Sequence, residues 1–402
     1  MERLVALLGL GVFIGFAYLI SVNRREIRWQ PVLWGLALQF IFALFILRTA
    51  IGFTIFEWLG STVSGFLNYS DAGASFVFGE NFQDFFFAFK VLPTVIFFSA
   101  FISLLYHYGI LQKAVQGVAW VMMRTMKTSG SETLSAAGNI FVGQTEAPLL
   151  IKPYVATMTL SELHAVMTGG FATIAGGVLA AYVSFGISPK DLIAASVMSA
   201  PAALAISKIM FPETAISPTQ GKVSLKVERT TANGIDAIAA GALDGLKLAL
   251  NIGAMIIAFL ALLAAFNALL GFLGGLFGYP EFSLELILAV LLAPIAWLMG
   301  VPWADCNAVG MLLGKKTILN EFIAYLDLQA LIESGEISDR AITIATYALC
   351  GFANVGSIGI QIGGISGIAP SRRADLARIG LRAMVAGTLA CFMTACIAGM
   401  LL

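Results

Sequence analysis

The strongest constraint on the fold is a series of long apolar runs separated by short polar segments. Eight runs are long enough to cross a membrane, because a helix of about 20 apolar residues spans the hydrocarbon layer. They cover residues 3–22, 32–49, 85–106, 160–184, 190–211, 237–272, 341–362 and 383–401. We therefore predict an all-α polytopic protein with eight transmembrane helices in a lipid bilayer.

Composition excludes several functional classes. Only 11% of the residues are charged, which is about half the share in a typical soluble domain. The formal net charge is zero, so nothing favours a nucleic-acid partner. The cysteines and histidines lack metal-ligand spacing, and no HExxH, GxGD or GxSxG motif is present. We therefore do not expect an enzyme, although buried carboxylates could in principle do acid–base work.

Basic residues gather in alternate segments between the apolar runs, and such segments stay preferentially in the cytoplasm. The segments 50–84 and 273–284 contain no Lys or Arg, so we place them outside. Both chain ends are then predicted on the outer side. The residues that decide this orientation are Arg24, Arg25, Arg28, Lys113, Arg124, Lys127, Lys222, Lys226, Arg229, Arg372, Arg373, Arg378 and Arg382.

The segment 129–158 cannot cross the membrane under this orientation. Residues 110–128, which have the pattern of an amphipathic interfacial helix, and residues 212–235 are both basic, and two clear spans lie between them. The segment 129–158 is therefore predicted to form a re-entrant hairpin with Asn139–Glu146 near its tip. Non-helical polar backbone at membrane depth is tolerated only where it lines a cavity.

Residues 283–333 repeat this arrangement from the other side. Their flanks are acidic, and the segment contains Lys315, Lys316, Asn320 and Glu321, which are too polar for a helix that faces lipid. We predict a second hairpin, entering from outside.

The two halves of the chain also share a short pattern. Gly170-Phe171-Ala172-Thr173 is matched by Gly351-Phe352-Ala353-Asn354, and glycines beside polar residues in mid-span indicate broken helices. Hairpin, broken helix and span would then occur twice with opposite entry, which is the inverted-repeat plan of secondary transporters. A chance match of close-packing glycines is the alternative. The predicted units are scaffold helices 1–128, a first transport repeat 129–211, a loop and long scaffold helix 212–282, and a second transport repeat 283–402.

The polar residues of the hairpins and breaks are rich in oxygens and amides. They include no arginine that could clamp an anion, so they suit a neutral ligand with several hydroxyl groups. Their oxygen atoms also suit a hard monovalent cation. Three alternatives stay open. The coupled ion could be a proton, the substrate could be another neutral polar metabolite, or the protein could be a channel with a continuous polar pore. The polar residues of the hairpins and breaks are Asn139, Gln144, Thr145, Glu146, Thr173, Glu321, Asn354 and Ser357.

Three segments resemble the signature sequences of the concentrative nucleoside transporters. They are Gly143-Gln144-Thr145-Glu146-Ala147-Pro148, Asn320-Glu321-Phe322 with Ala324-Tyr325, and Gly351-Phe352-Ala353-Asn354 with Ser357-Ile358-Gly359. The similarity runs from about residue 85 to the end, and the short N-terminal part resembles bacterial members. It implies a homotrimer in the bacterial cytoplasmic (inner) membrane that imports nucleosides such as uridine by sodium symport and an elevator-like movement.

The resemblance also implies roles for individual residues. Gly143, Gln144, Thr145, Glu146 and Val178 would form the nucleobase side of the pocket. Glu321, Asn354 and Ser357 would hold the ribose, and Phe352 would line the pocket. Sodium would be bound by the side chains of Asn139 and Thr173 and the carbonyls of Val142 and Ile174. Sodium-coupled members carry serine where this chain has Thr173. Threonine keeps the hydroxyl group of that serine. The preference between purine and pyrimidine nucleosides stays open.

Overall fold

The computed structural model describes residues 1–220 and 231–402, and every regular element within these ranges is a helix. Eight helical stretches in the described ranges are long and apolar enough to cross a membrane. They are Glu2–Leu19, Trp29–Arg48, Ala50–Phe78, Phe87–His107, Leu160–Ser184, Pro189–Met210, Gly234–Gly275 and Pro370–Leu401. The predicted all-α polytopic class is confirmed. The basic residues Lys222, Lys226 and Arg229 lie outside the described residues.

The eight stretches differ from the predicted ones at two places. Residues 50–84 were expected to be an external loop, but they contain α3 (Ala50–Leu67) and α4 (Ser70–Phe78). Thr49 caps α3 by accepting a hydrogen bond from the Gly52 amide at 3.0 Å, and the stretch Ala50–Phe78 is apolar and long enough to cross a membrane. The run 341–362 is not one helix, because α16 (Asp339–Leu349) and α17 (Val355–Ile368) are separated by a break.

The remaining helices form two series in which the elements follow one another in a similar order. The first comprises α5 (Leu92–His107), α6 (Ile110–Met126), the α7–α8 hairpin (Gly130–Gly138, Lys152–Val155), the broken helix α9–α10 (Leu160–Ala172, Gly176–Ser184) and α11 (Pro189–Met210). The second comprises α12 (Gly234–Gly275), α13 (Leu284–Leu298), the α14–α15 pair (Cys306–Ile318, Glu321–Ser334), α16–α17 and α18 (Arg373–Leu401). The first two helices, α1 (Glu2–Leu19) and α2 (Trp29–Arg48), precede both repeats.

This order corrects two details of the sequence interpretation. The predicted second hairpin, 283–333, includes α13, which is a separate helix that packs on α14 and corresponds to the amphipathic α6. The helix pair itself turns at Leu319 and Asn320. The Gly-Phe-Ala match is also out of phase, because Gly170–Ala172 end α9 whereas residues 351–353 follow the end of α16.

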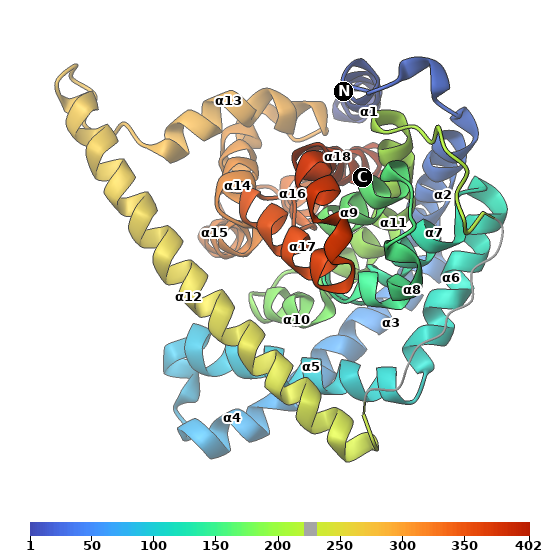
Figure 1. Cartoon of the computed structure of the whole chain (residues 1–402). Coiled ribbons are helices and arrows are strands. Elements are labelled where there is room, and N and C mark those ends of the chain that lie inside the picture. Colours follow the sequence, from blue (N-terminus) through green and yellow to red (C-terminus); the bar gives the residue numbers. More distant parts are fainter. Residues whose placement is uncertain (221–230) are drawn as a thin grey trace.

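The core lies where the repeats meet. In the most apolar 18-residue part of each stretch, 89% of the residues are buried in Pro189–Met210 and 83% in Leu160–Ser184. Figure 1 shows α9, α11, α16 and α18 at the centre of the molecule, with α12 along one edge. In the most apolar 18-residue part of α12 only 11% of the residues are buried, and the helix packs mainly against α5. The buried helices therefore carry the candidate site, while α12 and α5 lie outside it.

Candidate functional site

The tip of the first hairpin is a turn that the sequence builds from a helix end. The helix α7 ends at Gly138, and Asn139 is its C-terminal cap. The chain then turns with the Phe141 and Val142 amides donating to the Gly138 carbonyl, at 2.9 and 3.0 Å. A short 3-10 helix with Pro148 near its start follows. Proline is tolerated in the first turn of a helix, where its missing N–H would be unpaired anyway, so Pro148 marks the start of this short helix. The polar residues 139–146 before it stay outside regular helix.

The breaks in the two discontinuous helices touch each other. The Phe352 amide donates to the Thr173 carbonyl at 3.2 Å, so a hydrogen bond joins the two breaks directly. A Cβ on Gly351 would lie 2.6 Å from the carbonyl oxygen of Phe171, which is closer than any side chain could come. The glycine is therefore required by this backbone crossing.

Four of the predicted substrate residues form one chain of hydrogen bonds across these breaks. Gln144 donates through Nε2 to Ser357 Oγ at 3.3 Å, and the Ser357 amide donates to Asn354 Oδ1 at 2.9 Å. Asn354 Nδ2 donates to Glu321 Oε2 at 3.0 Å. The side chains of Gln144, Asn354, Ser357 and Glu321 are all buried. The chain therefore connects the first hairpin tip to the start of α15 through the start of α17.

Two buried residues that sequence reasoning missed extend this chain at its ends. Tyr182 donates its hydroxyl to Glu321 Oε1 at 3.1 Å. Gln361 donates through Nε2 to Gln144 Oε1 at 3.0 Å and to the Met167 carbonyl at 3.1 Å. Both side chains are fully buried. Gln361 lies one helical turn beyond Ser357, a spacing that would have placed it on the same face of α17.

The other predicted substrate residues lie around this chain. Thr145 donates to Glu146 Oε1 at 3.0 Å, and the Glu146 side chain is exposed. A Cβ on Gly143 would lie 2.3 Å from Glu146 Oε2, so the carboxylate folds back over the hairpin turn. Val178 and Phe352 belong to one apolar cluster. Neither Thr145 nor Glu146 is hydrogen-bonded to the buried chain.

Two of the predicted sodium residues, Asn139 and Thr173, both lie next to Gly169 near the end of α9. Thr173 donates its hydroxyl to the Gly169 carbonyl at 2.8 Å. The amide nitrogen of Asn139 lies 3.0 Å from the position that a Cβ on Gly169 would take. Asn139 is 1% exposed, and neither atom of its amide group has a hydrogen-bond partner in the described structure. Val142 and Ile174, whose carbonyls complete the predicted set, are also buried.

An orphaned amide of this kind requires an explanation, because buried polar groups are almost always paired. A cation held by the amide oxygen and nearby carbonyls would satisfy the Oδ1 half of this amide. The unpaired oxygen of Asn139, together with the Thr173 hydroxyl oxygen, is a donor set that fits the predicted sodium ion.

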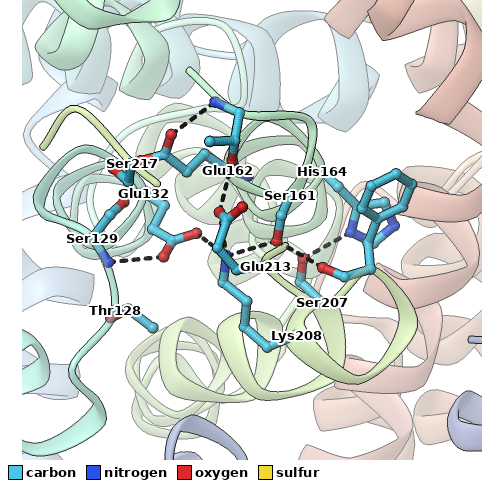
Figure 2. Close-up of polar contacts among 12 residues, drawn as sticks. Thr128, Ser129, Glu132, Ser161, Glu162, His164, Ser207, Lys208, Glu213 and Ser217 are labelled. Carbon is cyan, nitrogen blue, oxygen red and sulfur yellow. Dashed lines mark hydrogen bonds and ion pairs between the residues drawn. The ribbon is translucent and has the colours of Figure 1, made fainter. Parts of the chain in front are cut away.

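A second buried polar cluster lies at the other ends of α7 and α9 (Figure 2). Lys208 of α11 forms an ion pair with Glu132 of α7 at 2.6 Å and donates to Ser161 of α9 at 2.9 Å. Glu162 accepts from the Ser217 hydroxyl at 2.5 Å and, through its other oxygen, from the Thr159 amide at 2.8 Å. The acidic residues stabilise the N-terminal ends of both helices. The cluster therefore fixes the starts of α7 and α9, whose far ends carry Asn139 and Thr173.

Comparison with known families covers almost the whole chain. The model described as "Na+ dependent nucleoside transporter C-terminus" matches residues 191–399, and its N-terminal counterpart matches residues 8–81. A model described as "Nucleoside recognition" matches residues 88–189. The three matches together include both hairpins and both broken helices.

Similar proteins are found among curated sequences and solved structures. "Solute carrier family 28 member 3" is 51% identical in Eptatretus stoutii and 50% identical in Homo sapiens, in each case over 100% of this chain. These cover 61% and 60% of the relatives, so the chain spans about three-fifths of their length. A structure of CNTnw in an inward-facing, substrate-bound state has a TM-score of 0.94 and 40% identity, over 100% of this chain and 98% of that chain.

Proposed function

The chain belongs to the family of Na+-dependent nucleoside transporters, and we propose that it imports nucleosides such as uridine together with Na+. The proteins it matches are transporters, in line with the expectation that it is not an enzyme. Structures of CNTnw in outward-facing, intermediate and inward-facing states match it equally well, which supports alternating access.

The observation that carries the proposal is the hydrogen-bond chain Gln144–Ser357–Asn354–Glu321. Its groups come from both repeats and meet where the two broken helices cross. A carboxylate can accept hydrogen bonds from two adjacent hydroxyl groups, so Glu321 would bind the ribose by exchanging its present donors for them. Gln144, Thr145 and Glu146 would then face the nucleobase. An apolar wall of Val178 and Phe352 completes the proposed pocket.

Sodium coupling is supported by the unpaired amide of Asn139, which lies next to Gly169, the residue whose carbonyl accepts from the Thr173 hydroxyl. One Na+ that crosses a potential of 100 mV releases about 2.3 kcal/mol. Since each ~1.4 kcal/mol changes an equilibrium tenfold, the potential alone would support roughly fortyfold accumulation of a neutral nucleoside.

The division into a mobile and a fixed part is also proposed. The two transport repeats, 129–211 and 283–402, would move as one body against scaffold units 1–128 and 212–282, in an elevator-like step. The exposed, apolar α12 supports a homotrimer in which it faces other subunits. With 42 residues it is about 63 Å long, twice the thickness of the hydrocarbon layer.

The proposed membrane is the bacterial cytoplasmic (inner) membrane, with both chain ends outside. Arg3 donates to the Leu402 carbonyl at 2.5 Å, and Figure 1 shows the two ends close together. This contact supports their location on one side of the membrane.

The test is uptake of labelled uridine into proteoliposomes, with an inward Na+ gradient or with choline in place of Na+. We expect saturable uptake that requires Na+ and is competed by unlabelled nucleosides. Uptake that persists without Na+ and follows an imposed pH gradient would instead assign the coupling role to a carboxylate. Competition by other polar metabolites, with none by nucleosides, would refute the proposed substrate.

A further inference from the structure

Each repeat brings the C-terminal ends of two helices together. In the first repeat α7 packs against α9, and in the second α14 packs against α16. Each helix end leaves unpaired carbonyl groups and carries about half a negative charge. Both pairs of ends therefore favour a cation, and the proposed Na+ would supply it in the first repeat.

The second repeat lacks the oxygen ligands of the first. The C-terminal caps of α7 and α9 are Asn139 and Thr173, the two proposed sodium ligands. The caps of α14 and α16 are Leu319 and Cys350. Neither side chain suits Na+, because leucine has no ligand atom and sodium prefers oxygen to sulfur.

A lysine occupies this place instead. Lys316 lies in the last turn of α14, and its side chain is 1% exposed. Its ammonium group donates to the carbonyl of Ala348, in the last turn of α16, at 2.9 Å. The positive charge therefore lies between the same two helix ends that would receive Na+ in the other repeat.

The surroundings of Lys316 differ from those of an ordinary buried lysine. Its neighbour Lys315 pairs with Asp327 at 2.8 Å and Glu285 at 3.5 Å. Within the described residues, no ion pair involves Lys316. A buried charge without an ion-pair partner is costly. The Ala348 carbonyl compensates part of this cost, and the nearby Glu321 carboxylate interacts with the ammonium group electrostatically.

We propose that Lys316 supplies, as a tethered ammonium group, the cation that the second repeat would otherwise take from solution, so that one Na+ accompanies each nucleoside. The proposal rests on the proposed function only in that the first repeat binds Na+. Lys316 is a positioning residue, because it holds the end of α14 against the end of α16, next to Glu321 and Asn354.

The first test uses the wild-type protein in proteoliposomes. Uridine uptake and charge movement are measured together under voltage clamp. We expect one positive charge per nucleoside. Two charges per nucleoside would refute the role of Lys316 while leaving the proposed function intact. Uptake that is indifferent to Na+ would refute the proposed function itself.

The second test measures binding of labelled uridine to purified variants in saturating Na+. We expect Lys316→Ala to bind at least about tenfold more weakly, a loss of ~1.4 kcal/mol. Ethylammonium chloride, which restores the missing end of the side chain, should return affinity to within about threefold of wild type. N-methylglucamine chloride, at equal ionic strength, should not.

Two further variants separate charge from packing. Lys316→Gln keeps a hydrogen-bond donor and loses the charge, so it should bind as weakly as Lys316→Ala. The matched control Lys315→Ala should keep wild-type binding and show no response to ethylammonium. Wild-type affinity in Lys316→Gln, or no rescue of Lys316→Ala by ethylammonium, would refute the proposal. If neither Lys316 variant folds, the charge measurement on wild type decides.

Discussion

Replacing Asn139 by leucine should have opposite effects on stability with and without Na+. The Asn139 amide is buried and unpaired, and an unsatisfied buried polar group costs about 1–3 kcal/mol. Leucine has a similar size and no polar atom. We therefore expect Asn139→Leu to be more stable than wild type in Na+-free buffer, by up to that amount.

Sodium should reverse this order. A ligand at 100 times its Kd stabilises the folded state by about 2.7 kcal/mol, and only wild type should receive this gain. The measurement is thermal or denaturant unfolding of the detergent-purified proteins in NaCl and in choline chloride. The free energies of unfolding of wild type and Asn139→Leu, plotted against Na+ concentration, should therefore cross.

Asn320 provides the matched control. It is also buried, but its Oδ1 accepts a hydrogen bond from the Ile323 amide at 2.9 Å and so caps α15. Asn320→Leu should lower stability in both salts by about 1 kcal/mol and keep the response to Na+. An Asn139→Leu variant that is destabilised in choline, or that still gains stability from Na+, would show that its amide is not an ion ligand.

Three further substitutions test the rest of the polar framework. Glu321→Gln should weaken uridine binding roughly 10- to 100-fold, because a charged hydrogen bond is worth about 1.5–3 kcal/mol; equal affinity of wild type for uridine and 2′-deoxyuridine would contradict ribose binding there. Gln361→Leu should weaken binding several-fold by freeing Gln144 (a neutral hydrogen bond is worth about 1 kcal/mol), with more effect on base selectivity than on the Na+ requirement; an unchanged ranking of nucleosides would contradict this. Lys208→Met should lower stability by about 3–5 kcal/mol by leaving Glu132 buried without its partner, and adding Glu132→Gln should restore part of the loss; strictly additive effects in this double-mutant cycle would contradict the coupling.

The sequence predicted the helix breaks because their polar residues and glycines differ in composition from the apolar runs around them; the re-entrant course of the hairpins stays a prediction. Polar residues and glycines within apolar runs have few acceptable structures in a membrane, so Asn139–Glu146 and residues 351–357 were recognisable. The residues that face one another there, Gln144 with Ser357 and Asn354 with Glu321, were predicted as members of one set. Their hydrogen bonds were not, because pairing depends on how two distant breaks cross.

Other features gave no such signal. Tyr182 has the appearance of a packing residue in an apolar helix, and only its contact with Glu321 distinguishes it. The loop assigned to 50–84 was wrong because the absence of Lys and Arg was used as a mark of location, although it says little about helix formation. The separate helix α13 was joined to the second hairpin because hydrophobicity alone does not show where one helix ends and the next begins.

In the proposed site Thr173 would serve both parts. Its hydroxyl donates to the carbonyl of Gly169, the residue next to the Asn139 amide, and its own carbonyl accepts from the Phe352 amide. A shift of this one residue would therefore be felt by the ion ligands and by the nucleoside pocket through a single peptide unit. Thermodynamic linkage then makes the effect reciprocal. Whatever factor Na+ adds to nucleoside affinity, a bound nucleoside must add to Na+ affinity, so either solute alone would be held more weakly than the two together.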